Sequence, residues 1–256
     1  MVKGLYAAYT GMMNQQKRLD VVSNNLANST TVGFKKEGAT SQSFDSVFAV
    51  KIKDMSENNR DKYIGNLNLG VKIGETYTDY DQGSFKSTEG TYDLAIQGNG
   101  FFAISFTNKA GVESTMYTRD GSFTLTNDGH LVTKDGDYVL GQSGPVVIPA
   151  DSTVSIDELG NIYANEEYVD KLNIVDFEDY NYLEKYGENL YIAADGATTK
   201  DATGTVAQGY LEMSNVQVVE EMVEMITIQR AYEAAQKAET TMDDMLSKVV
   251  TLGKVK

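Results

Sequence analysis

The sequence predicts an α+β protein in which paired N- and C-terminal coiled-coil helices accompany a mainly antiparallel β domain, either a sandwich or an irregular barrel. Three observations lead to this prediction. Apolar residues recur at heptad spacing near both ends of the chain, and the hydrophobic period changes from that of a helix to that of a strand between Leu67 and Leu211. Turn sequences such as Asp128-Gly129 separate the apolar runs of this middle section, and no helical pattern lies between them.

The C-terminal segment from Ser214 to Leu252 is expected to form one long helix. Ser214 and Gln217 fit a capping box at its start, and Gly253 fits its end. The heptad a and d positions are all apolar, as in a helix that packs along a narrow seam: Ile228, Ala231, Ala235, Ala238, Met242, Met245, Val249 and Leu252. Upstream apolar residues continue the stripe on a slightly rotated face: Val218, Met222, Met225 and Tyr232. In isolation, the same pattern also fits an amphipathic helix that covers the core of its own domain.

The N-terminal segment carries a matching heptad pattern. Leu5, Met12, Leu19 and Leu26 recur every seven residues, with Ala8, Gln15 and Val22 between them. The helix is expected to end between Asn25 and Asn28, where a polar run and then Gly33 interrupt the pattern. We therefore expect the two terminal helices to pair with each other, or with those of other copies.

Composition limits the remaining possibilities. The 256 residues carry a formal charge of −15, from 22 basic and 37 acidic side chains, and the scattered acids argue against a nucleic-acid partner. Cysteine is absent, and no apolar run approaches the ~18 residues of a membrane span, so membrane insertion is not expected. A cleavable secretory signal is also absent, which predicts either a cytoplasmic protein or export by a route that keeps the N-terminus.

These patterns divide the chain into three parts. Residues 1–30 and 214–256 are expected to form the helical domain, 31–66 an extended connector and 67–213 the β-rich domain. The connector has weak periodicity, and its segment from Lys53 to Asp61 offers almost no apolar side chain for burial, although an ordinary surface loop fits the same composition. The acidic, tyrosine-rich stretch from Glu166 to Tyr191 is expected either to cover one end of the sheet or to offer a contact surface.

No residue pattern predicts a catalytic, cofactor or metal site. Gly98-Asn99-Gly100 precedes an expected strand rather than a helix, which indicates a tight turn and not a dinucleotide site. His130, the single histidine, follows a turn without a nucleophile motif and is interpreted as structural. Asp135-Gly136-Asp137 lacks the other ligands of a calcium loop. The sequence therefore favours a structural protein over an enzyme.

Characteristic motifs lie along nearly the whole chain. At the N-terminus these are Val22-Ser23-Asn24-Asn25-Leu26-Ala27-Asn28 and Thr31-Val32-Gly33-Phe34-Lys35-Lys36. In the middle they are the run from Tyr92 to Phe102 and Tyr117-Thr118-Arg119-Asp120-Gly121-Ser122-Phe123, and near the end the run from Gln208 to Val216 and Gln229-Arg230-Ala231-Tyr232-Glu233. Together these motifs resemble those of the flagellar basal-body rod and hook proteins, and the length and single β domain are similar to those of rod proteins. The C-terminal helix resembles the distal rod type, whereas the segment from Tyr138 to Pro145 resembles the proximal type.

The resemblance implies a structural rod subunit that polymerises helically into a hollow, torque-transmitting shaft with the export channel inside. It implies further copies, other rod and hook proteins and the flagellar type III export apparatus as partners, and an extracytoplasmic place in the basal body without signal cleavage. The subunit contacts are expected on the terminal helices: Leu5, Met12, Leu19, Val22, Leu26, Met222, Met225, Ile228, Tyr232, Ala235, Met242, Met245 and Val249. A corner between helix and connector is expected at Asn24, Asn25, Asn28, Thr31, Gly33 and Phe34, with Gly33 at positive φ.

Two other function classes fit parts of the sequence. The first is a secreted β-sandwich binding module, an adhesin or glycan-binding protein with a coiled-coil oligomerisation stalk, in which Tyr180 belongs to the binding surface. The second is a β-sandwich hydrolase that depends on His130 and Glu167. No cofactor is expected in either case.

Overall fold

The computed structural model describes residues 2–50, 63–108, 111, 113–149, 152–187 and 189–253. The chain folds into two compact units. The first, here called the helical unit, comprises Met1–Ala27, Glu37–Asp79 and Gln217–Lys256; the second, the β unit, comprises Asn28–Lys36 and Tyr80–Val216. The β unit therefore begins its main segment at Tyr80, whereas the sequence placed that boundary at Leu67.

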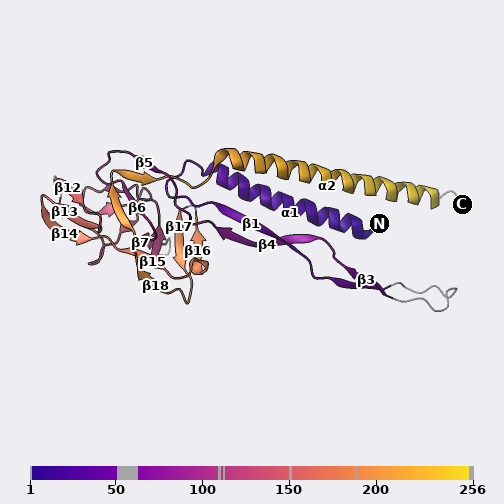
Figure 1. The fold of residues 1–256 in the computed structure, drawn as a ribbon, viewed down its shortest axis with the longest axis horizontal. Helices are drawn as coiled ribbons and strands as arrows, with labels where there is room; N and C mark the ends of the chain where they lie inside the picture. Colours follow the sequence, from indigo (N-terminus) through magenta and orange to yellow (C-terminus); the bar gives the residue numbers. More distant parts are fainter. Residues whose placement is uncertain are drawn as a thin grey trace. The chain divides into compact units, whose positions relative to one another are not determined.

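The helical unit contains two long helices, α1 (Val2–Ala27) and α2 (Val218–Gly253). It also contains a two-stranded antiparallel ribbon, drawn beside the helices in Figure 1. One part of the ribbon pairs β1 (Glu37–Ser43) with β4 (Val71–Thr78), and the other pairs β2 (Val47–Val50) with β3 (Tyr63–Leu67). Much of the expected connector is thus regular structure, and its Lys53 to Asp61 segment lies outside the described residues.

The β1–β4 part of the ribbon gives a weak signal in the sequence because it buries little on either face. Along β1 and β4 the side chains are half-buried or exposed, without a buried row on alternate positions. An isolated pair of strands is marginally stable in water, so support from α1 is important. That support includes Asn14, whose Nδ2 donates to Ser41 Oγ at 2.9 Å.

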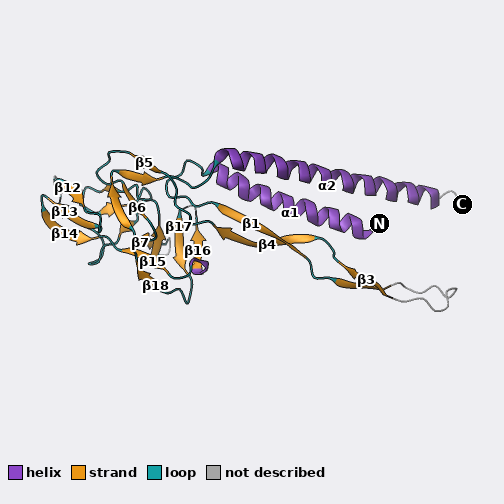
Figure 2. Ribbon diagram, viewed as in Figure 1, coloured by secondary structure: helices purple, strands orange, loops and turns teal. Residues whose placement is uncertain are grey.

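The β unit, whose strands are orange in Figure 2, is built around a nine-stranded sheet. Its main path follows the order β16-β17-β8-β7-β11-β10-β9, and β15 joins β7 to β18. The bounds are β7 (Phe101–Thr107), β8 (Glu113–Thr118), β9 (Thr124–Leu125), β10 (Leu131–Val132), β11 (Tyr138–Val139), β15 (Ile174–Phe177), β16 (Leu183–Tyr186), β17 (Leu190–Ala193) and β18 (Thr199–Asp201). A short 3₁₀ helix, η1 (Tyr180–Tyr182), precedes β16.

Three smaller sheets complete the β unit. One has the order β12-β13-β14, and the other two pair β19 with β6 and β20 with β5. Their bounds are β5 (Phe85–Ser87), β6 (Leu94–Gln97), β12 (Val154–Ile156), β13 (Asn161–Ala164), β14 (Glu167–Lys171), β19 (Thr205–Gln208) and β20 (Tyr210–Glu212). Every strand pair described is antiparallel, which confirms the expected α+β class with a mainly antiparallel β domain.

Two apolar clusters form the core of the β unit. The larger contains side chains from most of the sheets: Leu94, Ile96, Phe102, Phe123, Leu131, Val139, Val146, Ile148, Val154, Ile162, Ala164, Leu172 and Val206. The smaller consists of Phe101, Phe177, Leu183 and Tyr191, with Tyr80, Tyr117 and Tyr180 packed against it. Phe101 and Phe102 point to opposite faces of β7, as neighbours on a strand must, and so supply one cluster each.

The start of α2 differs from the expected capping box. The helix begins at Val218, so Ser214 lies too far upstream to be its cap. Ser214 is buried, and its Oγ accepts a hydrogen bond from Val216 N at 3.2 Å. A serine can bond its own backbone two residues on as readily as it caps a helix, and the local sequence does not distinguish the two.

Candidate functional site

The terminal helices contact each other within the helical unit. Arg18 Nη2 lies 2.9 Å from Glu224 Oε1, and Asn25 Nδ2 donates to Glu221 Oε2 at 3.2 Å. Near the other end, a Cβ placed on Gly4 would lie 3.1 Å from Met242 Cε. The start of α1 therefore meets the later part of α2 and its end meets the beginning of α2, so the helices run antiparallel (Figure 1).

The residues expected at subunit contacts fall into two groups. Val22 and Ile228 are buried within the unit, and most of the others are half-buried: Leu5, Met12, Leu19, Leu26, Met225, Tyr232, Ala235 and Met242. Met222, Met245 and Val249 are exposed. Part of the heptad stripe thus packs inside the unit, and the remainder is exposed.

The expected corner residues are distributed over both units. Asn24 is exposed at the end of α1, whereas Asn25 is buried. The Asn25 side chain donates to Glu37 O at 2.8 Å and accepts from Glu37 N at 2.9 Å, as a partner strand would. With the bond to Glu221, one amide therefore links the end of α1, the start of β1 and the first turn of α2.

The burial of Glu221 was not indicated by the sequence. The sequence places it on the first turn of α2, where the helix dipole favours an acid at the surface. Its side chain is instead 1% exposed. A buried carboxylate is costly unless it is hydrogen-bonded, so the bond from Asn25 is important for its placement.

In the β unit, Gly33 fixes the path of the chain after the corner. Its φ is +71°, as expected, and its N donates to Glu212 O at 2.8 Å. A Cβ at this position would lie 2.5 Å from Asp120 N, so the close approach of two backbone segments also requires glycine. Thr31 is half-buried, and its N donates to Asn28 O at 3.2 Å.

Phe34 and Lys35 anchor this segment in the β unit. Phe34 is fully buried, with Lys185 Nζ 4.1 Å from its ring centroid. Lys35 is also buried, at 1% exposure. Its Nζ donates to Asp81 O at 2.8 Å and to Glu212 Oε1 at 2.6 Å.

Glu212 is the centre of a buried charge cluster. Its Oε1 accepts from Lys35 Nζ and from Gly83 N at 3.0 Å, and its Oε2 lies 3.1 Å from Arg119 Nη1. Arg119 Nη2 also donates to Gly98 O at 2.7 Å, and its guanidinium carbon lies 5.3 Å from the Phe101 ring centroid. Lys35, Arg119 and Glu212 come from the three motif regions, so the cluster joins the N-terminal, central and C-terminal parts of the sequence.

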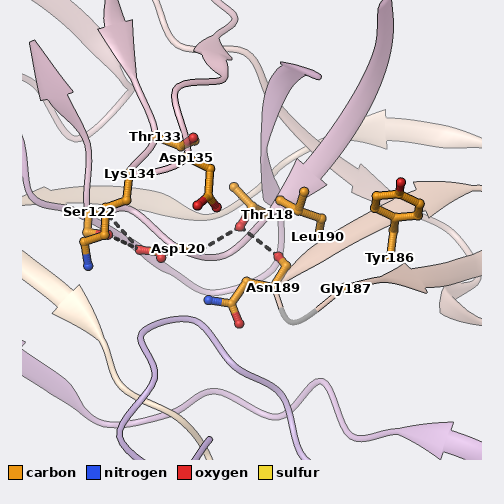
Figure 3. A pocket seen from close by; sticks show the side chains of 10 residues that line it. All are labelled: Thr118, Asp120, Ser122, Thr133, Lys134, Asp135, Tyr186, Gly187, Asn189 and Leu190. Atoms are coloured by element: carbon orange, nitrogen blue, oxygen red, sulfur yellow. Dashed lines mark hydrogen bonds between the residues drawn. The ribbon is translucent and has the colours of Figure 1, made fainter. Parts of the chain in front are cut away.

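A pocket of about 330 Å³, lined mainly by residues with polar side chains, lies in the β unit (Figure 3). Its hydrogen-bonding groups hold the surrounding loops. Thr118 Oγ1 donates to Asn189 O at 2.9 Å and accepts from Asp120 N at 3.0 Å. Asp120 Oδ1 accepts from Ser122 N at 2.9 Å and from Ser122 Oγ at 2.5 Å. The arrangement is a structural one, in which hydroxyl and carboxylate groups stabilise turns.

The described residues contain no group of three or more His, Cys, Asp or Glu side chains that could hold a metal ion. His130 is half-buried, and its ring lies edge-on to Tyr138 with 5.1 Å between centroids. Within the same described part of the chain, neither helix has the length and apolarity needed to cross a membrane.

The tyrosine-rich stretch contains both exposed and buried side chains. Tyr168 and Tyr182 are exposed, whereas Tyr191 is fully buried. Tyr180 packs 4.9 Å from Tyr80 between ring centroids, and its hydroxyl donates to Asp176 Oδ1 at 2.7 Å. Burial, together with the hydrogen bond and negative charge of Asp176, raises the pKa of Tyr180 to about 12. Tyr180 is therefore part of the core packing, which does not suit the ligand-contacting role considered for it.

Three sequence profiles match the chain in the order that the motifs suggested. The profile for flagella basal body rod protein matches residues 5–35, and that for the flagellar hook protein FlgE/F/G D1 domain matches residues 95–164. The profile for the flagellar basal body rod FlgEFG protein C-terminal region matches residues 207–252.

Relatives that match over nearly their full length show the same similarity. The chain is similar to the flagellar basal-body rod protein FlgG of Bacillus subtilis, with 37% identity over 273 residues that cover 98% of this chain and 99% of the relative. Identity to FlgG of Caulobacter vibrioides is 35%, with 96% and 97% covered. Identity to the flagellar basal-body rod protein FlgF of the same organism is 33%, with both chains covered completely. This chain belongs to the flagellar basal-body rod family.

Family membership confirms the resemblance and the function expected from it. The protein is a structural subunit of the flagellar basal-body rod, located in the basal body, and the family role implies assembly with other rod and hook proteins. The family is structural rather than enzymatic. The matches give no support to an adhesin or glycan-binding module.

Proposed function

We propose that this rod subunit polymerises helically with further copies of itself into a hollow shaft that transmits torque and encloses the export channel. In this proposal α1 and α2 form the inner, coiled-coil domain, and the β-rich part of the chain forms the outer wall. The antiparallel contacts between the helices, from Gly4–Met242 to Asn25–Glu221, support a paired inner domain. The expected division into 1–30, 31–66, 67–213 and 214–256 is part of the same proposal.

The exposed apolar side chains of α2 are the observation on which the proposal depends. Met245, Val249 and Leu252 share one side of the last turns of α2 and remain between 46% and 76% exposed after the two helices have paired. Grouped apolar side chains on a helix surface indicate a protein contact, since burying one contributes roughly 1.5–3 kcal/mol. Contacts between unlike surfaces that do not close into a ring generate an open helical assembly.

We further propose export through the flagellar type III apparatus to an extracytoplasmic position without removal of an N-terminal signal. The support is the place of α1 in the fold. Asn14 bonds to Ser41, Arg18 to Glu224 and Asn25 to Glu37 and Glu221. Cleavage within α1 would remove these contacts and with them one of the two helices expected to pair in the shaft.

A charge on the exposed part of the helix tests the assembly. Met245→Asp places a carboxylate where an apolar neighbour is expected, while Ser247→Asp places the same charge on the exposed opposite side of α2. In cells that depend on each variant, we expect Met245→Asp to abolish rods and motility and Ser247→Asp to preserve both. Circular dichroism of the purified chains should show the same folded β unit in each. Normal rods built from Met245→Asp would contradict the proposal.

A further inference from the structure

The beginning of α2 carries a second apolar surface, on the side opposite its contact with α1. We call it the apolar patch: Val219, Met222, Val223 and Ile226, with exposed fractions of 75%, 48%, 60% and 50%. Their spacing of three and four residues places them on one face of the helix. Glu221 and Ile228, which are buried within the unit, lie on the other face. The helical unit therefore leaves a continuous apolar area uncovered.

The same unit contains a groove between α1 and the β1–β4 ribbon. Its volume is about 290 Å³, and its apolar lining includes Tyr9, Met13, Phe44, Val71 and Ile73. Tyr9 and Met13 are exposed on α1. Two basic side chains also line the groove, Lys17 from α1 and Lys72 from β4, and no acidic side chain does.

The charges around the patch are opposite to those of the groove. From Val218 to Gln229, α2 contains three glutamates and no basic residue. Glu221 is buried, and Glu224 pairs with Arg18, so Glu220 is the exposed acid beside the patch. The first basic residue, Arg230, follows one turn after Ile226. An apolar surface with an acidic border thus exists on the same unit as an apolar groove with a basic lining.

We propose that the apolar patch of one copy docks into the groove of the next copy. The proposal rests on the proposed function and names the two surfaces that meet in it. Because patch and groove are different surfaces of one chain, the pair formed by the first contact still has one free patch and one free groove, and the contact propagates. Patch-to-patch pairing would close a dimer and bring two Glu220 side chains of like charge together, which is unfavourable. Docking into the groove instead places Glu220 near basic side chains.

Cysteine cross-linking tests which surfaces meet, because the chain has no cysteine of its own. Met13→Cys places a thiol in the groove, and Val223→Cys places one in the patch. We expect a disulfide-linked dimer when the two variants are mixed under mild oxidation, formed about tenfold faster than between Met13→Cys and Leu159→Cys, an exposed position in the β unit. Cross-linking of Val223→Cys with itself at an equal rate would overturn the proposal in favour of patch-to-patch pairing. Mixed rates no higher than those of the Leu159→Cys control would also overturn it.

A charge exchange gives an independent readout. The Lys17→Glu/Lys72→Glu variant carries an acidic groove, and Glu220→Lys carries a basic border on the patch. Each alone should associate about tenfold more weakly than the original chain in sedimentation at low salt. A mixture should recover association, since each variant's groove then meets a patch of opposite charge. Equal association of all samples, or no recovery on mixing, would overturn the proposal.

The outcomes also separate this inference from the proposed function. If cells build rods from the two cysteine variants expressed together and the isolated rods contain no Met13–Val223 cross-link, the docking contact is wrong while polymerisation stands. If the unmodified chain is absent from rods, the proposed polymer itself is wrong.

Discussion

Replacement of Glu212 by Gln tests whether the buried charge cluster holds the β unit together. Glu212 is 1% exposed, and its carboxylate faces two cations that are themselves buried, Lys35 at 2.6 Å and Arg119 at 3.1 Å. The amide has nearly the same shape but no charge, so it removes the carboxylate that both cations face. Removal of one partner from a buried ion pair typically costs about 3–5 kcal/mol. We therefore expect Glu212→Gln to lower the free energy of unfolding by about that amount, a large part of the roughly 5–15 kcal/mol of a typical domain.

The measurement is urea unfolding followed by near-ultraviolet circular dichroism of the tyrosines, since the chain has no tryptophan. Glu184→Gln is the matched control, because Glu184 is exposed on β16. It should change stability by less than about 0.5 kcal/mol. A loss below about 1 kcal/mol for Glu212→Gln would refute the reasoning, since it would mean that water or a rearranged partner compensates the two cations.

Three further predictions concern single positions. Ile228→Ala should destabilise the helical unit by about 2–4 kcal/mol through a buried cavity, whereas Ile226→Ala, a 50% exposed position in the patch, should weaken assembly and leave thermal unfolding nearly unchanged. Gly33→Ala should cost more stability in urea unfolding than Gly136→Ala, because both glycines have positive φ but a Cβ at Gly33 meets backbone while one at Gly136 meets open space. The pKa of Tyr180 is raised from 10.0 to about 12, so its contribution to stability should be complete below about pH 10 and disappear as the pH rises through about 12. Tyr180→Phe should therefore reduce the loss of stability measured between these two pH values, and an unchanged pH profile would contradict it.

Some of the fold follows from local patterns. The end of α1 at Ala27, the end of α2 at Gly253 and the positive φ of Gly33 agree with the sequence analysis, because each depends on a few neighbouring residues. The change of hydrophobic period after Leu67 likewise indicated antiparallel strands in the middle of the chain, where the structure has the strands that begin at Phe101, Val154 and Ile174. The exposed patch on α2 also has a local signal, the spacing of apolar residues from Val219 to Ile226. The heptad register through Ile228, however, predicts contacts on the opposite face of the helix.

Tertiary structure decided what local patterns could not. The ribbon of β1 and β4 forms although neither strand has a buried row, because α1 supports it and the two strands satisfy each other's backbone. Burial of Lys35 depends on Glu212, 177 residues away, and on the contact of that same carboxylate with Arg119. A charged side chain has the same local signature at a surface as in a core, and its place is determined by which distant partner the folded chain brings to it. The sequence by itself determined the helices at both ends and the antiparallel strands between them, because backbone periodicity is a short-range property. The charge cluster, the ribbon and the groove beside α1 were decided by long-range packing.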